Sequence, residues 1–291
     1  MTKLKIQLDI VQILFMKYLI LIFFVSISFS CSVSKLDRTH NFPTEEEKVS
    51  VLPDKNEVWV FIMAGQSNMA GRAFVTARDT IINKRILTIN KQGELIYAKE
   101  PLHFYEPNKT GLDCGLSFGK YLIDKIPSNI SILLIPTAIG GSSISQWIGD
   151  SLHRNVKLFT NFKEKVQVAK QYGNIKAILW HQGETDADKD ESKFYTQRLS
   201  ILFKKFRNLI ENDSLPIFIG ELGSYSKNPV QWSKINNCIK DYSMIDEKTA
   251  IIKTSDLKQL GDFEHFTSKS VRILGKRYAN TYVKKMKEST K

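Results

Sequence analysis

Short apolar runs alternate with amphipathic stretches along most of the chain. The runs are rich in β-branched and aromatic residues, which predicts strands buried on both faces, as in a parallel sheet. We expect five such strands, near Val58, Ile130, Ile175, Pro216 and Ala250. The amphipathic stretches predict helices near Gly115, Val156, Ser192, Val230 and Ser268. This repeating order, with right-handed crossovers, predicts an α/β fold around a mainly parallel sheet.

The pattern breaks between residues 72 and 110. There the segment Arg85–Tyr97 is typical of a small hairpin that turns near Gln92 and Gly93. Because this hairpin follows the first strand closely, it is a candidate wall of a substrate cleft. An excursion over the protein surface is an equally good interpretation.

The end of the first strand presents a candidate nucleophile. The apolar run from Val58 leads into Gly65, and the turn after it places Ser67 between Gln66 and Asn68. In open α/β sheets the reactive groups lie beyond the carboxyl ends of the strands, where this serine is expected. A serine that only caps the next helix would give the same pattern.

A nucleophilic serine needs a base, and the base needs a carboxylate that orients it. Of the five histidines, His265 has the best setting, because Asp262 precedes it by three residues and an amphipathic helix follows. A short turn would bring this carboxylate to the imidazole ring. Taken alone, Asp262 and His265 are more commonly surface loop residues, and only the presence of Ser67 favours the catalytic interpretation.

Two further strand ends offer donors for the oxyanion of a tetrahedral intermediate. After the second expected strand, Gly141 allows close approach of the backbone to a ligand, so its N–H is one candidate donor. After the third, the side-chain amide of Gln182 is another. In the same segment His181 and Glu184 form an H-x-x-E pair, but a zinc site needs three or four convergent ligands. We therefore expect no metal and no cofactor, and a structural role for His181.

These segments together resemble the ordered blocks of the SGNH hydrolase superfamily. The resemblance is carried by Gly65–Gly71, by Thr137–Ile144 with Trp147, by His181–Asp186 and by Asp262-x-x-His265. The similarity is greatest to the sialate O-acetylesterase-like group, which includes acetylxylan esterases of the carbohydrate esterase family 6 type. An α/β-hydrolase is disfavoured, because its G-x-S-x-G turn would need glycine where Met69 stands.

The resemblance implies a three-layer, flavodoxin-like α/β/α sandwich with a five-stranded sheet, and it implies a role for each motif residue. Ser67 would be the nucleophile, His265 the base and Asp262 the acid that orients it. The oxyanion hole would consist of Ser67 N–H, Gly141 N–H and the Gln182 amide. Supporting hydrogen bonds are expected from Gln66, Asn68 and Glu184.

The function implied is removal of O-acetyl groups from carbohydrates by a serine esterase. A carbohydrate O-acetyltransferase would use the same residues, and a surface glycan-binding lipoprotein could keep the fold without catalysis. The sequence does not identify the sugar. We expect an acetylated carbohydrate as the substrate.

The amino-terminal residues are typical of an export signal. Lys17 precedes the apolar run Tyr18–Phe29, which is too short for a membrane span, and Met16 is an alternative start. Cys31 resembles the lipidated cysteine of bacterial lipoproteins, although simple cleavage nearby would also fit. We therefore assign residues 1–30 to a signal peptide, 31–56 to a flexible tether and 57–291 to one esterase domain. The expected location is the periplasm or cell surface of a bacterium.

The remaining composition adds little to this picture. The formal net charge is +12, but the lysines are scattered and no nucleic-acid recognition motif is present, so a solvated basic surface is the simplest explanation. We expect no nucleic-acid partner and no membrane contact beyond the anchor. The surplus charge weakly favours acidic glycans. If Cys31 is acylated, Cys114 and Cys238 remain, and the sequence leaves open whether they pair.

Overall fold

The computed structural model describes residues 37–289. The expected signal peptide, Met16 and Cys31 lie outside the described residues, so export and lipidation stay predictions. All elements below belong to the unit Arg38–Lys291. Within residues 37–289, no helix combines the length and the hydropathy needed to cross a membrane.

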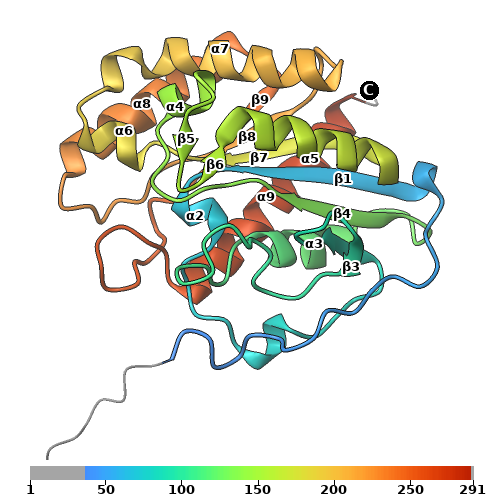
Figure 1. The fold of residues 1–291 in the computed structure, drawn as a ribbon. Coiled ribbons are helices and arrows are strands. Elements are labelled where there is room, and N and C mark those ends of the chain that lie inside the picture. The colour runs from blue at the N-terminus through green and yellow to red at the C-terminus, as the bar shows by residue number, and fades with distance from the viewer. Residues whose placement is uncertain (1–36, 290–291) are drawn as a thin grey trace, which may run out of the picture. The chain divides into compact units, whose positions relative to one another are not determined.

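A seven-stranded sheet forms the centre of this unit, in the order β3-β2-β4-β1-β7-β8-β9 (Figure 1). Five strands coincide with the expected ones: β1 (Val58–Gly65), β4 (Ser131–Pro136), β7 (Asn174–His181), β8 (Ile217–Gly220) and β9 (Thr249–Ile252). They pair in parallel, so the expected α/β fold with a mainly parallel sheet is confirmed.

The expected count of five strands is wrong, because the predicted hairpin extends the sheet. It consists of β2 (Ile86–Ile89) and β3 (Leu95–Tyr97), which pair antiparallel. All four residues of β2 are buried, and β2 pairs in parallel with β4. The apolar run of β2 thus covers the edge that β4 would otherwise expose. The hairpin is therefore part of the sheet.

Helices cover both faces of the sheet. The long ones are α3 (Gly115–Ile123), α5 (Leu158–Tyr172), α7 (Ser192–Ile210), α8 (Pro229–Ile245) and α9 (Ser268–Ser289). Short ones follow the strands as α2 (Ser67–Ala70), α4 (Ile144–Ile148) and α6 (Glu184–Asp188), with 3₁₀ turns η1 (Lys55–Glu57) and η2 (Ala77–Asp79). A small hairpin of β5 (Leu152–His153) and β6 (Val156–Lys157) precedes α5.

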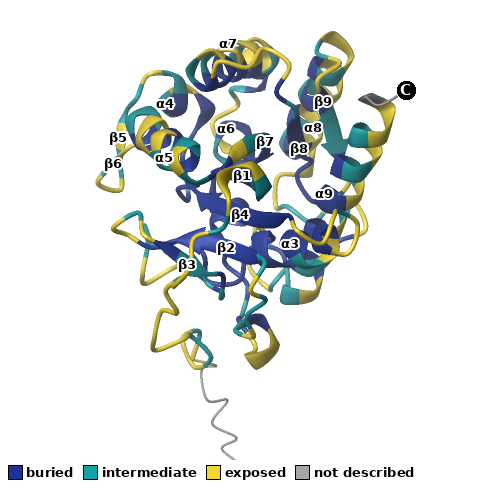
Figure 2. Cartoon of the chain, turned by 90° about the vertical axis from the view of Figure 1, so that its right-hand side faces the viewer, coloured by how far each residue is buried: buried dark blue, intermediate teal, exposed yellow. Residues whose placement is uncertain are grey.

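The core has two halves because successive residues of a strand face opposite sides of the sheet. Val60 and Ile62 of β1 pack into a cluster with α5, α7 and α8, whereas Phe61 and Met63 pack into a second cluster with α3 and α9. Figure 2 shows the central strands buried and the outer helix surfaces exposed. The expected three-layer sandwich is therefore confirmed.

Backbone hydrogen bonds join the carboxyl ends of the three central strands. After β1, the Gln66 N–H donates to the His181 carbonyl at the end of β7 (2.9 Å). The segment after β4 is attached in the same way, because the Ile139 N–H donates to the Gly65 carbonyl (3.1 Å). The loops after β1, β4 and β7 therefore meet at one edge of the sheet.

Part of the expected tether contacts the domain. The Val49 N–H donates to the Leu95 carbonyl (3.2 Å), and the Tyr97 N–H donates to the Glu47 carbonyl (2.9 Å), so residues 47–49 run beside β3. The Arg38 guanidinium donates to the Lys109 carbonyl (2.7 Å). The described part of this segment is thus held at several points.

The two cysteines whose pairing was open are free thiols. Cys114 is buried with its Sγ atom 3.7 Å from the Met69 Sδ atom, and the Cys238 thiol donates to the Ser192 carbonyl (3.3 Å). The structure therefore contains no disulfide between Cys114 and Cys238.

Gly65 is required by the close approach of β1 and β7. Its φ is 135°, and a Cβ atom there would lie 2.0 Å from the His181 carbonyl oxygen. We expect Gly65→Ala to lower the free energy of unfolding by about 3 kcal/mol or more, because strain and backbone overlap add. Gly261→Ala is the matched control: its φ is 121°, but a Cβ atom there meets nothing within 4 Å. Urea unfolding that shows equal losses for both variants would contradict this explanation.

Candidate active site

The serine, histidine and aspartate singled out in the sequence are joined by hydrogen-bond contacts through the histidine ring. Ser67 begins α2 directly after β1, and its Oγ atom is 2.9 Å from Nε2 of His265. On the other side of the ring, Nδ1 is 2.7 Å from Oδ2 of Asp262. With a proton on Nδ1 donated to the carboxylate, Nε2 is free to accept the hydroxyl proton of Ser67.

The loop between β9 and α9 holds Asp262 in place. Its Oδ1 atom accepts hydrogen bonds from the N–H groups of Glu264 (3.0 Å) and His265 (2.8 Å). Burial would raise the pKa of the Asp262 carboxyl, but these bonds and the one to the His265 ring outweigh it and hold the pKa below its ordinary value. The carboxylate therefore stays charged where it orients the imidazole.

Ser67 and His265 open into a polar pocket of about 350 Å³. Its lining consists of Arg38, Ser67, Arg72, Asn108, Lys109, Gly141, Arg154, Asp262, Glu264 and His265. Gly141 has a φ of 74°, which suits glycine. Among the hydrogen bonds of residues 37–289, none uses the N–H of Ser67 or of Gly141. Both residues expected to supply a backbone donor therefore line the pocket.

Gln182, the third expected donor, has a different place. The residue is fully buried, and its Nε2 atom donates to the Ser142 carbonyl (3.0 Å), to Oε1 of Gln66 (3.0 Å) and to Oδ2 of Asp186 (2.6 Å). The two hydrogens of the Gln182 amide are thus already shared among three acceptors. Because Gln182 does not line the pocket, its oxyanion role stays a prediction that requires the amide to leave one of these partners.

The three residues expected to support the site are buried beneath the nucleophile. Oε1 of Gln66 accepts from the Gln182 amide and from the Thr185 N–H (3.3 Å). Nδ2 of Asn68 donates to Oε1 of Glu184 (2.6 Å). The expected supporting contacts therefore exist, and they connect the turn after β1 with the segment after β7.

Burial moves two pKa values beside this network. It lowers the pKa of His181 to about 4 and raises that of Glu184 to about 7, while the hydrogen bond from Asn68 opposes the second shift. Nδ1 of His181 lies 3.6 Å from Oε1 of Glu184. His181 is thus neutral at physiological pH, and in residues 37–289 no group of three histidine, cysteine or carboxylate side chains has the arrangement of a metal site.

A chain of ion pairs at the pocket was not anticipated. Glu106 contacts the guanidinium groups of both Arg72 and Arg154, and it also accepts from the Gly140 N–H (2.7 Å). Burial lowers the pKa of Arg72 to about 10. Arg72 directly follows the Gly65–Gly71 motif, which was the available signal, but nothing in the sequence indicated its partners. These ion pairs therefore hold two guanidinium groups in the lining of the pocket that contains Ser67.

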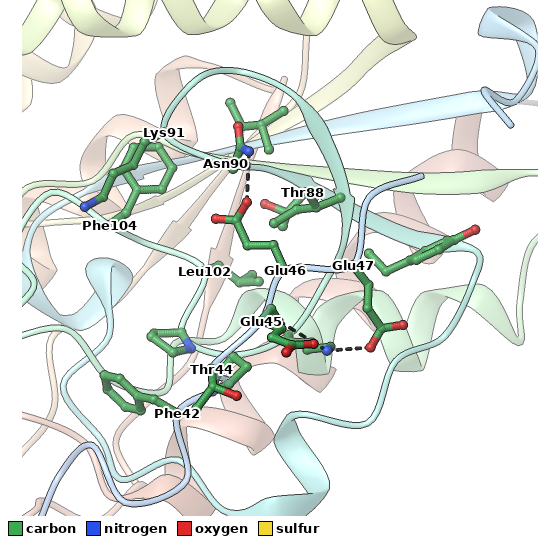
Figure 3. A pocket seen from close by; sticks show the side chains of 16 residues that line it. Phe42, Thr44, Glu45, Glu46, Glu47, Thr88, Asn90, Lys91, Leu102 and Phe104 are labelled. Carbon is green, nitrogen blue, oxygen red and sulfur yellow. Dashed lines mark hydrogen bonds and ion pairs between the residues drawn. The ribbon is translucent and has the colours of Figure 1, made fainter. Parts of the chain in front are cut away.

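A second cavity lies elsewhere, between the amino-terminal segment and the β2–β3 hairpin (Figure 3). It measures about 290 Å³, and its walls include Phe42, Phe104 and the hydrogen-bonded pair Glu46 and Asn90 (2.9 Å). No histidine or cysteine lines it. The hairpin therefore borders this cavity rather than the pocket of Ser67, and the cavity offers no nucleophile–base pair.

The Glu184 carboxyl should make stability depend on pH. The pKa of this carboxyl is about 7 in the folded protein, compared with an ordinary value of 4.5. Between pH 4.5 and 7 the folded state therefore holds a proton that the unfolded state has lost. The free energy of unfolding therefore falls as pH rises through this window, whereas His181 contributes the opposite slope between about 4 and 6.5.

We expect Glu184→Gln to abolish the unfavourable slope. Relative to the wild type, the variant should gain up to about 3 kcal/mol between pH 4.5 and 7.5. Urea unfolding at several pH values measures this difference, and a difference that does not change with pH would contradict it.

Comparisons with known proteins identify relatives of this chain by sequence and by fold. A carbohydrate esterase of Arabidopsis thaliana, itself described as probable, is 27% identical over 246 residues, which is 77% of this chain and 90% of that protein. Its crystal structure superimposes with a TM-score of 0.69 at 24% identity, covering 78% of this chain and 98% of that one. The crystal structure of NanS superimposes with a TM-score of 0.65 at 16% identity, covering 82% of this chain and 99% of that one.

The structure of a carbohydrate acetylesterase from Xanthomonas citri gives a TM-score of 0.55 at 16% identity, covering 78% of this chain and 56% of that chain. These three structures support the fold. The family is shown by sequence, because the profile described as "Carbohydrate esterase, sialic acid-specific acetylesterase" matches residues 57–284. This chain therefore belongs to the sialic acid-specific acetylesterase family of carbohydrate esterases.

Proposed function

We propose that this protein is a serine esterase that removes O-acetyl groups from carbohydrates through Ser67, His265 and Asp262. The observation that carries the proposal is the pair of hydrogen bonds, 2.9 and 2.7 Å long, that joins these side chains at the rim of an open pocket. Family membership supplies the substrate class, an acetylated carbohydrate.

The first half of the reaction transfers the acetyl group to the enzyme. His265 Nε2 accepts the hydroxyl proton as Ser67 Oγ attacks the ester carbonyl carbon. The bond between that carbon and the sugar oxygen then breaks, and the sugar oxygen takes the proton from His265. Asp262 stabilises the imidazolium that forms in between. The products of this half are a free sugar hydroxyl and acetyl-Ser67.

The second half releases acetate. Water gives a proton to His265 and attacks the acetyl carbon, and Ser67 Oγ leaves with the proton returned. In both halves the oxyanion needs donors, and in this proposal the N–H groups of Ser67 and Gly141, two residues that line the pocket, supply them. One such donor lowers the barrier by about 3 kcal/mol. Two backbone donors therefore account for a large part of the rate enhancement without the Gln182 amide.

We expect Ser67→Ala to lower acetate release from p-nitrophenyl acetate and from acetylated glycans by about 10⁴-fold or more. Ser200→Ala, which changes an exposed serine on α7, is the control and should keep full activity. A wild-type protein that releases no acetate would contradict the proposal and favour a glycan-binding role. Acetyl groups found on an added acceptor sugar would identify a transferase instead.

The charges of the pocket favour a sugar that carries a carboxylate. Four basic side chains line it, those of Arg38, Arg72, Lys109 and Arg154, against the carboxylates of Asp262 and Glu264. The guanidinium groups of Arg72 and Arg154 both contact Glu106, but the Arg72 side chain is only 7% exposed, whereas that of Arg154 is 34% exposed. A guanidinium group binds a carboxylate with two parallel hydrogen bonds. Arg154 is therefore the best-placed group for such a substrate.

We expect Arg154→Gln to lower kcat/KM for acetylated acidic sugars by about 10- to 100-fold, the usual loss for one charged hydrogen-bonding group. Activity on p-nitrophenyl acetate and on acetylated neutral sugars should change little. Lys204→Gln removes a charge from α7, outside the pocket, and serves as the control. Equal losses on acidic and neutral sugars would rule out carboxylate recognition by Arg154.

A further inference from the structure

Asn68 bonds to the backbone on both sides of His265. Its Nδ2 atom donates to the Glu264 carbonyl (3.0 Å), and its Oδ1 atom accepts from the Phe266 N–H (3.2 Å). These bonds span 196 and 198 residues of sequence. Since Asn68 directly follows Ser67, one side chain connects the turn of the nucleophile with the segment that carries the base.

A buried carboxyl fixes the orientation of this amide. Besides the Glu264 carbonyl, Nδ2 of Asn68 donates to Oε1 of Glu184 at 2.6 Å. Both hydrogens and the oxygen of the carboxamide are thus used. A flipped carboxamide would place its oxygen against the acceptors of Glu184 and Glu264, and its NH₂ group against the Phe266 N–H. Asn68 is 3% exposed and Glu184 1% exposed, so water does not compete for these bonds. The amide is held in a single orientation.

The buried Phe266 holds the chain directly after His265, whereas the loop before His265 is exposed. Asp262, Phe263 and Glu264 are exposed, and Gly261 before them lies in open space. Two backbone bonds, Leu260 N–H to the His265 carbonyl (2.7 Å) and Thr267 N–H to the Lys258 carbonyl (2.9 Å), close the loop only onto itself. The bonds from Asn68 instead join it to the turn after β1, where Ser67 lies.

We propose that Asn68 is a positioning residue that sets the distance between Ser67 Oγ and His265 Nε2 by holding the backbone on both sides of His265. This inference rests on the proposed serine esterase function and adds to it the residue that aligns nucleophile and base. Glu184 acts one step further away, by holding the Asn68 amide. Neither side chain lines the pocket, so the effect should fall on the chemical step rather than on substrate binding.

The test compares Asn68→Ala with Asn236→Ala. Asn236 of α8 makes the same kind of double backbone contact, because its Nδ2 donates to the Leu222 carbonyl (3.0 Å) and its Oδ1 accepts from the Leu222 N–H (2.8 Å). It lies outside the pocket lining. Both variants lose two backbone hydrogen bonds, and Asn68→Ala also loses its bond to Glu184, so its melting temperature should fall further than that of Asn236→Ala. Only the Asn68 variant loses the alignment of Ser67 and His265.

For Asn68→Ala we expect kcat on p-nitrophenyl acetate to fall about 100-fold, as for a misplacement of reacting groups by about 1 Å, with KM changed less than about threefold. The rate at which diethyl p-nitrophenyl phosphate labels Ser67 should fall in parallel. Asn236→Ala should keep both rates. If Asn68→Ala does not fold, Asn68→Leu keeps the size but can neither donate to the Glu264 carbonyl nor accept from the Phe266 N–H, and it should show the same loss of kcat.

The inference is overturned if either folded Asn68 variant keeps kcat within about threefold of the wild type, or if Asn236→Ala loses as much. A rise in KM with kcat unchanged would also overturn it, because that would mark a binding role. These outcomes are distinct from failure of the proposed function, which would appear as full activity in Ser67→Ala. In that case, Asn68 would have no serine to align.

Discussion

Three loops meet at one edge because β1 lies between β4 and β7 and runs parallel to both. The parallel direction sends Ser67, Gly141 and Gln182 to the same side from segments far apart in sequence. The absence of a side chain at Gly65 lets the turn after β1 approach the His181 carbonyl. If this approach were lost, the Gln66 N–H would lose its acceptor and Ser67 would lose its position. The chemistry thus depends first on a backbone contact between two strands.

The polar groups under this turn are costly to bury. Gln66, Gln182 and Glu184 are at most 1% exposed, and Nε2 of Gln66 and Oε2 of Glu184 have no partner among the described residues. Such a network is less stable than an apolar core of the same volume. It nevertheless fixes directions that apolar side chains leave free. Fixed hydrogen-bond directions are what a site needs when it has to hold a hydroxyl and an imidazole in line.

The sequence motifs predicted the central strands and pointed to Ser67, Asp262 and His265, which the structure places in mutual hydrogen-bond contact, because each motif carries its own local geometry. Ser67 follows a recognisable buried strand, and Asp262 reaches His265 across a turn of three residues. The Asn68 contacts could not be foreseen in this way, since they join residues nearly 200 positions apart. The same holds for Glu106, whose two arginine partners come from other segments. The hairpin of β2 and β3 was predicted, but its place in the central sheet was not, because the pairing of β2 with β4 decides that place.

The two halves of the site differ in how they are anchored. Ser67 and Gly141 extend from the sheet and are fixed by the backbone bonds between its strands, whereas Asp262 and His265 lie on a loop with exposed neighbours. The proposed reaction needs a proton transfer between Ser67 and His265, and such a transfer tolerates little error in distance. The loop must therefore be attached to the turn of the nucleophile itself and not merely to the rest of the protein. Under the proposed function, the side chain of Asn68, which directly follows Ser67 and bonds to the backbone on both sides of His265, provides this attachment.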